Sequence, residues 1–169
     1  EHIMDVIKKN NLTAVGEANY PYLTKPDTEY NTDGVYHVKL KITKAEAQKD
    51  IKIINDIISS EVAKEHKAKP GNTGLIKRAS LPYAIEGDDV TFKFKTKYKP
   101  RLYEKSGGPF PEDKSIWNGT TMRVSYQPSG YNQAIGVGCT LRLVYCQIDN
   151  LVEGTTNDRV EPIGEVKNA

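Results

Sequence analysis

The stretch GVYHVKLKITKAE, residues 34–46, contains two different periodicities, one after the other. In its first part Tyr36, Val38, Leu40 and Ile42 alternate with His37, Lys39 and Lys41. A period of two is typical of a strand that buries one face. Thr43 and Glu46 then have the spacing of a capping box, in which the hydroxyl accepts a hydrogen bond from the amide of the third helical residue. The stretch therefore predicts a strand that leads directly into a helix.

The pattern that follows predicts one long helix. Apolar residues recur at three- and four-residue steps, at Ala47, Ile51, Ile54, Ile58 and Val62. This spacing is that of an amphipathic helix, which we expect over about residues 44–67. Pro70-Gly71 ends it.

A second alternating stretch, TFKFKTKYKPR at residues 91–101, combines aromatic and basic residues. On a half-buried strand, Phe92, Phe94 and Tyr98 would face the core, and Lys93, Lys95, Lys97 and Lys99 would face water. Three further strands are expected near residues 12–23, 120–127 and 133–151, with a loop at 25–27 and a turn at 128–130. In the strand at 120–127, Met122, Val124 and Tyr126 share one parity, opposite to Thr121, Arg123 and Ser125.

One helix and about five strands, each burying one parity, predict a mainly β fold. We expect an OB-fold-like five-stranded barrel with one long inserted α-helix at about 44–67. The domain would cover residues 4–153. Residues 1–3 are expected to be a remnant before a natural start at Met4, and residues 154–169 a polar, mildly acidic and disordered segment.

Charge is unevenly distributed along the chain. The formal net charge is +2, yet residues 93–105 hold six basic residues against one acid, and residues 146–169 hold five acids against two basic residues. This asymmetry suggests a surface for a polyanion and a terminal segment of opposite sign. Apolar runs stay well short of the ~20 residues of a membrane span, so no membrane association is expected. Cys139 and Cys146 lie in one expected strand at odd spacing, so they should face opposite sides and remain reduced.

The sequence motifs favour binding over catalysis. The chain contains three histidines and no Cys/His pair at zinc spacing, no HExxH, no phosphate-binding glycine loop and no GxSxG. We therefore expect neither an enzyme nor a metal or cofactor.

The candidate site combines basic strand faces with aromatic side chains. The expected phosphate contacts are Lys39, Lys41, Lys93, Lys95 and Arg123, and the expected base-stacking residues are Tyr131, Trp117 and Tyr22. Exposed lysines also keep strand edges from pairing with other chains, and loop aromatics also cap barrel ends, so each feature has a purely structural explanation.

Several segments, in order, resemble the replication single-stranded DNA-binding protein of short-tailed lytic bacteriophages. They are YPYLTKPD (20–27), DGVYHVKLKI (33–42) followed by a long helix, TFKFK (91–95) and NGTTMRVSYQPSGYNQAIGVGCTLRLVYCQI (118–148). The resemblance implies an OB-fold core that binds and protects single-stranded DNA regardless of sequence during phage replication and recombination, in the cytoplasm of the infected bacterium. It also implies partners in phage DNA polymerase and helicase-primase, and it leaves a homodimer open.

Residue by residue, the resemblance assigns basic groove positions to Lys95 and Arg123, and the aromatic before Asn-x-Ala to Tyr131. Asp33 and Ser125 stand where the family has basic residues, and only a modestly acidic stretch precedes the last two residues in place of the family's long acidic tail. Contact with polymerase through such a tail is therefore not evident here. Two alternatives stay open: an RNA-binding OB module, and a structural or virion protein with a solvated basic strand.

Overall fold

A computed structural model of the protein describes residues 10–29, 32–71 and 74–153, and every structural statement below concerns these residues. The expected remnant at residues 1–3 and the expected disordered segment at 154–169 lie outside them. The strands are β1 (Asn11–Leu12), β2 (Gly16–Asp27), β3 (Val35–Thr43), β4 (Tyr83–Glu86), β5 (Asp89–Thr96), β6 (Arg101–Tyr103), β7 (Thr121–Gln133) and β8 (Gly136–Asn150). The helix is α2 (Lys44–Ala68). No helix in the described part of the chain is long and apolar enough to cross a membrane.

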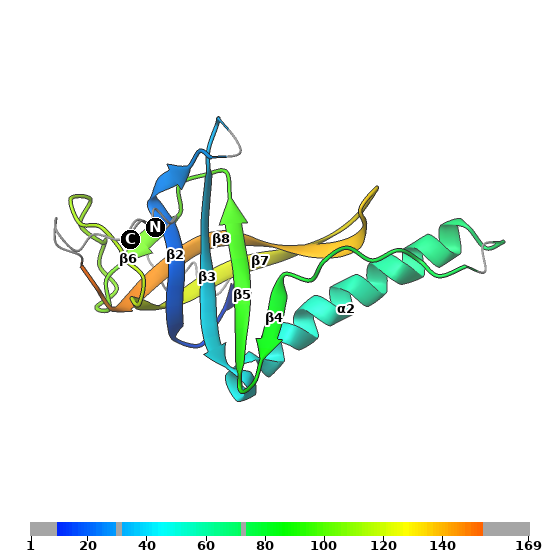
Figure 1. The fold of residues 1–169 in the computed structure, drawn as a ribbon, viewed down its shortest axis with the longest axis horizontal. Coiled ribbons are helices and arrows are strands. Elements are labelled where there is room, and N and C mark those ends of the chain that lie inside the picture. The colour runs from blue at the N-terminus through cyan, green and yellow to red at the C-terminus, as the bar shows by residue number, and fades with distance from the viewer. Residues whose placement is uncertain (1–9, 30–31, 72–73, 154–169) are drawn as a thin grey trace, which may run out of the picture.

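Five of the strands close into a ring (Figure 1). Going around it, β2 pairs with β3, β3 with β5, β5 with β8, β8 with β7 and β7 again with β2. All of these pairings are antiparallel except that of β5 with β8. β1 and β6 pair with β7 and β8 outside the ring, and β4 pairs with β5. The prediction of a mainly β fold with five closing strands and one long helix is confirmed.

The inward parities of the ring strands form the core. Val38, Leu40, Phe92 and Phe94 are fully buried, as the alternation in β3 and β5 predicts. Strand β3 passes without a break into α2, where the Thr43 hydroxyl accepts a hydrogen bond of 3.2 Å from the Glu46 amide. The predicted cap and helix are thus confirmed.

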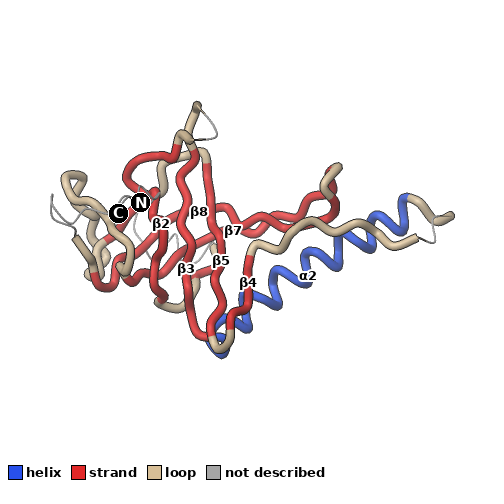
Figure 2. Tube along the Cα trace, in the orientation of Figure 1, coloured by secondary structure: helices blue, strands red, loops and turns tan. Residues whose placement is uncertain are grey.

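Strands β7 and β8 continue beyond the ring as a long two-stranded arm, with α2 alongside it (Figure 2). Two glycines permit close approaches to the arm. A Cβ on Gly130 would come within 2.9 Å of Ile57 on α2, and one on Gly136 would meet the backbone of residues 77–79 within 2.9 Å. Gly136 also has a φ of +120°, which favours glycine. The amide of Val137 and the carbonyl of Lys77 are joined by a hydrogen bond of 3.0 Å, so the segment after α2 supports the tip of the arm.

Two proline-containing segments predicted as a loop and a turn belong to strands. Residues 25–27 end β2, and residues 128–130 lie inside β7, where Pro128 is opposite Leu141. The turn occurs instead at residues 134–135. Proline lacks an amide proton and is tolerated where a strand has a neighbour on one side only. Within the described part of the chain, β7 pairs only with β8 at Pro128, so proline does not mark the turn there.

The alternation failed in three strands, β5, β7 and β8. Tyr98 is 75% exposed because β5 ends at Thr96, before the pattern in the sequence ends. Ser125 is fully buried, beside a register shift between Ser125 and Tyr126. The same shift adds a residue to β8, so Cys139 and Cys146 are both buried although their spacing is odd. Both are free thiols, as expected.

A buried hydrogen bond attaches α2 to the ring. The Tyr126 hydroxyl donates to the carboxylate of Asp50, and both side chains are fully buried. Burial, and to a smaller extent the hydrogen bond to Asp50, raises the pKa of Tyr126 far above its usual value, so the hydroxyl remains a donor. Lys49 adds an ion pair of 3.2 Å to the same carboxylate.

Replacing Tyr126 by Phe should lower the free energy of unfolding by about 1–3 kcal/mol, because a buried carboxylate oxygen loses one of its two donors and keeps only Lys49. Tyr145→Phe is the matched control: Tyr145 is equally buried, and its hydroxyl has no hydrogen-bond partner among the described residues. Its removal should leave stability unchanged or slightly higher. Urea denaturation of both variants measures the difference, and equal losses would contradict this account.

Candidate nucleic-acid interface

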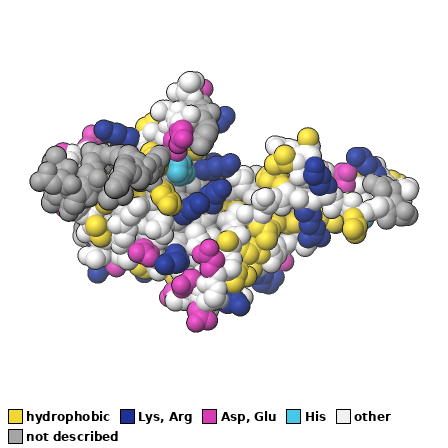
Figure 3. All heavy atoms as spheres, viewed as in Figure 1, with side chains coloured by type: hydrophobic (Ala, Val, Ile, Leu, Met, Phe, Trp, Pro, Cys, Tyr) yellow, Lys and Arg dark blue, Asp and Glu magenta, His cyan; other side chains and the backbone are white. Residues whose placement is uncertain are grey.

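The outer face of β3 and β5 gathers most of the predicted cations. Lys39 lies directly opposite Lys93, and His37 lies opposite Lys95. Side chains at directly paired antiparallel positions are about 4.5–5.5 Å apart at Cβ. Among the described residues, Lys39, Lys93 and Lys95 have no acidic ion-pair partner. Figure 3 looks onto this face, where basic side chains collect beside a histidine.

Acidic residues limit this face on two sides. Lys41, also predicted as a phosphate contact, forms an ion pair of 3.3 Å with Glu17 of β2, which is opposite it in the sheet. At the other end Asp27 accepts a hydrogen bond of 2.9 Å from His37. The unpaired positive charge is therefore concentrated between these two carboxylates, and Lys41 contributes less of it than its sequence position suggests.

Tyr22 joins the same face from β2. It is opposite His37, and the two ring centroids are 4.8 Å apart with an interplanar angle of 34°. The hydrogen bond to Asp27, also on β2, further fixes the His37 ring. Of the three predicted stacking residues, Tyr22 is the one placed directly among the β3–β5 cations.

Arg142 of β8 was missed by sequence reasoning, although it belongs to the cationic surface. It pairs with Lys95 across the parallel β5–β8 contact, and its guanidinium donates to the Gln127 side chain. The two cations line a groove of about 680 Å³ together with Lys97 and Tyr98. The alternation of residues in β8 could have predicted this orientation. Arg142 lies between the buried Leu141 and Leu143, so its side chain must point outward.

Tyr131 continues this surface along the arm. Residues 127, 129 and 131 of β7 share one parity and pair with residues 142, 140 and 138 of β8. Gly130, of the opposite parity, faces α2, so Tyr131 lies on the arm face away from the helix, which it shares with Arg142. Its ring lies against Gly138, where a Cβ would be 2.5 Å from the tyrosine oxygen.

Arg123 and Trp117 lie on other parts of the molecule. Arg123 is opposite Gln147, and its charge acts on Tyr145, whose pKa burial and Tyr103 raise to about 12 against the lowering effect of Arg123. In the ring, β2 on one side and β8 and β5 on the other separate β7 from β3. Trp117 is bonded through its amide to the Val152 carbonyl at 3.2 Å, near the described C-terminal end.

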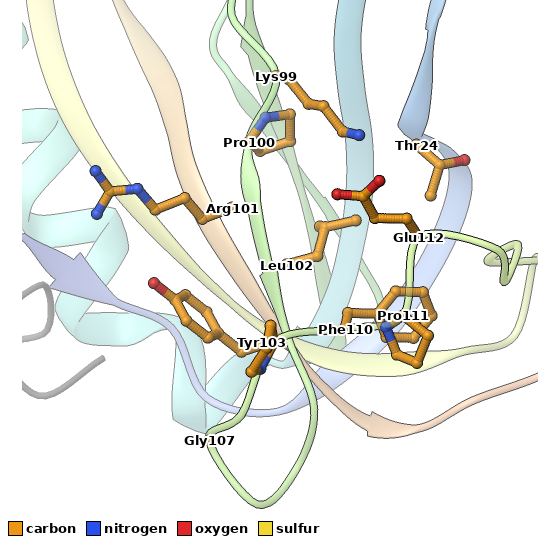
Figure 4. Close-up of a pocket in the computed structure, with 11 residues that line it drawn as sticks. Thr24, Lys99, Pro100, Arg101, Leu102, Tyr103, Gly107, Phe110, Pro111 and Glu112 are labelled. Atoms are coloured by element: carbon orange, nitrogen blue, oxygen red, sulfur yellow. The ribbon is translucent and has the colours of Figure 1, made fainter. Parts of the chain in front are cut away.

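Lys99, the last lysine of residues 91–101, does not extend the β5 face. Lys99 lines a separate cavity of about 640 Å³ with Glu112, and in Figure 4 both side chains point into it while Arg101 points away. The run of four lysines thus divides between two surfaces after β5 ends at Thr96. Among the described residues no cluster of three or more His, Cys, Asp or Glu side chains could hold a metal ion.

The comparisons with known proteins agree with this architecture. No protein-family model and no curated protein matches the chain. Among solved structures, the chain is similar to gp2.5, a single-stranded DNA-binding protein encoded by bacteriophage T7, with a TM-score of 0.74 and 24% identity over 89% of this chain and 97% of that one. It is also similar to the single-stranded DNA-binding protein from bacteriophage Enc34 in complex with single-stranded DNA, with a TM-score of 0.60 and 13% identity over 84% and 86% of the two chains. The chain therefore has the fold of these phage DNA-binding proteins, as the resemblance in the sequence implied.

The Asp27–His37 pair gives this face a pH-dependent contribution to stability. Burial raises the pKa of Asp27, but hydrogen bonds from His37 and the Glu29 amide outweigh it and lower the pKa below its ordinary value of 3.8. A lowered carboxylate pKa contributes stability above pH 4 or so, and this contribution is lost as the pH falls through the lowered pKa. Asp27→Asn should therefore be less stable than the parent at about pH 5, and the difference should shrink by about pH 2.5. Urea denaturation at the two pH values tests this, and a constant difference would refute it.

Proposed function

We propose that the protein binds single-stranded DNA without sequence preference, along the outer face of β3 and β5 and onto the β7–β8 arm. The observation that carries this proposal is the continuous set of cations Lys39, Lys93, Lys95 and Arg142 on that surface. In OB folds the second and third ring strands and the hairpin between the fourth and fifth are the usual sites for oligonucleotides. Here these elements are β3, β5 and the arm.

The placement of the lysines itself favours a ligand. Lys39 and Lys93 are directly opposite each other, and like charges at such positions destabilise a sheet. A phosphate between them would neutralise both. Because phosphate contacts carry no sequence information, this surface would bind any sequence.

Aromatic rings beside the cations favour single strands. Tyr22 of β2 lies opposite His37, which is itself opposite Lys95, and Tyr131 lies on the arm face that it shares with Arg142. Stacking on such rings requires bases whose faces are exposed, which a duplex does not offer. Both of the similar solved structures are of single-stranded DNA-binding proteins, one of them in complex with single-stranded DNA, which supports the same ligand.

A role in phage DNA replication and recombination follows as the wider proposal, with polymerase and helicase-primase as partners. These assignments depend on the resemblance in the sequence and on the shared fold. The absence of catalysis, the homodimer and the location in the infected bacterium likewise stay predictions.

Binding should weaken steeply with salt. Four phosphate contacts would give a slope of log K against log salt near −3, from about −0.7 per contact on single strands. Lys39→Ala and Lys95→Ala should each make the slope shallower by about 0.7, and Lys39→Ala should leave stability unchanged or higher, because a like-charge pair is removed. Fluorescence anisotropy titrations of a labelled oligonucleotide at several salt concentrations measure this.

One further variant serves as a matched control, and a second tests a remaining site prediction. Lys52→Ala removes an exposed lysine of α2, 76% of whose side chain is accessible, and should leave the slope unchanged. Arg123→Ala tests the prediction from the sequence that Arg123 contacts phosphate. A flat salt response of the parent would refute the proposal and favour a structural protein. Stronger binding of single-stranded RNA than of DNA of equal length would favour the RNA-binding alternative.

Tyr131→Ala should weaken single-strand binding by about 1–3 kcal/mol, or about 5- to 150-fold, through loss of a stacking surface. The salt slope should hardly change, because stacking releases no counterions. The melting temperature should also change little, since Tyr131 lies on the arm and outside the ring core. Parental affinity in this variant would show that Tyr131 is not a base platform.

A further inference from the structure

Tyr20 has an unfavourable backbone conformation that the fold nevertheless maintains. Its φ is +52°, the only positive value at a non-glycine residue among the described residues, and Pro21 follows it. Left-handed backbone is costly for a side chain of this size, and such outliers collect at functional sites. The residue is also 45% exposed, so burial of the side chain does not explain the conformation.

A neighbouring segment fixes this conformation. The Tyr20 amide donates a hydrogen bond of 2.7 Å to the Asn118 side chain, and the Gly119 amide donates to the Ala18 carbonyl at 3.0 Å. The register between β2 and β3 shifts here, between Asn19 and Tyr22. Such irregularities turn a side chain in a new direction beside a binding site. Tyr20 is therefore held with its ring on the outer face of the sheet.

The ring forms one wall of a groove whose floor is basic. The groove has a volume of about 470 Å³ and is lined by Tyr20, Lys39, Lys93, Pro82 and Leu81, among others. The Lys39 ammonium lies 5.9 Å from the centre of the Tyr20 ring, and Lys93 is opposite Lys39. On the far side the Pro82 carbonyl accepts from the Lys93 amide at 2.9 Å, which fixes that wall.

Two other residues define the shape and polarity of the groove. Tyr83 has its hydroxyl bonded to Asn55 of α2 at 2.9 Å and its ring against Phe92, so its ring belongs to the core side of β4. Glu86 also lines the groove, on the strand that follows Pro82. Its carboxylate would repel a phosphate, so an anionic group is favoured only near Lys39 and Lys93.

We propose that this groove holds one nucleobase of a bound single strand, stacked on Tyr20, with the adjoining phosphate between Lys39 and Lys93. The inference rests on the proposed function and adds a specific subsite to it. A nucleobase stacks on a flat aromatic side chain, and the phosphate of the same nucleotide needs cations close by. The groove offers both. The volume is within the range of about 300–1,000 Å³ that is usual for small-ligand pockets.

Tyr20→Gly is the decisive variant, because it separates stability from binding. Glycine adopts a positive φ readily, so the melting temperature should stay the same or rise. The affinity for an oligothymidine of fixed length should fall by about 5- to 150-fold, with an unchanged salt slope. Tyr20→Phe keeps the ring and should bind like the parent. A Tyr20→Gly protein that is stable and binds like the parent would overturn the subsite.

Abasic oligonucleotides identify the interaction as base stacking. Replacing the bases of the oligonucleotide by abasic sites should weaken the parent more than it weakens Tyr20→Gly, because one stacked base is already lost in the variant. Equal losses in both proteins would mean that Tyr20 does not contact a base. If the parent itself shows no salt-dependent binding to single strands, the proposed function fails first, so the two failures are distinguishable.

Asn118→Ala tests the positioning of the ring. Loss of the Asn118 side chain should reduce the part of the affinity that depends on the bases of the oligonucleotide. The double variant Asn118→Ala, Tyr20→Gly should bind no more weakly than Tyr20→Gly alone. Additive losses in the double variant would show that Asn118 acts independently of Tyr20.

Discussion

The parallel pairing of β5 with β8 is the contact on which both the ring and its charged surface depend. Without it, strand pairing among the described residues would join the sheet of β2, β3 and β5 to the hairpin of β7 and β8 only at Gly16 and Glu17. Parallel neighbours need a long connection, and residues 97–135, which include β6 and β7, supply it. The same pairing places Arg142 beside Lys95, so ring closure and assembly of the cationic surface are one event.

The arm depends on support from outside the ring. A two-stranded hairpin is marginally stable alone in water, and β7 and β8 extend well past their ring neighbours. The arm is covered by α2 at Gly130 and by residues 77–79 at Gly136. Since α2 is in turn attached through Asp50 and Tyr126, the buried hydrogen bond and the position of Tyr131 are linked. Rigid support of this kind keeps a partly exposed ring in one orientation, which reduces the entropy lost when a base stacks on it.

Much of the fold could be read from the sequence because hydrophobic periodicity reports burial directly. The capping box at Thr43 predicted the junction between β3 and α2. The alternation through Phe92 and Phe94 predicted that the lysines of β5 face outward. Strand ends and register shifts were not readable, since Tyr98 continues the apolar parity after the strand has ended. The two residues that matter most beyond the predicted set, Arg142 and Tyr20, depend on pairing between distant segments. Periodicity within β8 indicates that Arg142 points outward, but it contains no information about which residue of a distant strand lies beside it.

The distribution of carboxylates, more than the number of lysines, defines where a polyanion fits. The chain has 24 basic and 22 acidic residues, so total charge alone would not attract one. Glu17 neutralises Lys41, Asp27 engages His37, and Glu112 shares a cavity with Lys99. What remains is the uncompensated row through Lys39, Lys93 and Lys95, where like charges face each other at a cost to the sheet. The repulsion between these lysines lowers the stability of the sheet, so burial elsewhere in the fold must offset it. Leu40 and Phe92, which are next to Lys39 and Lys93 in sequence and fully buried on the opposite face of the same two strands, contribute to this offset.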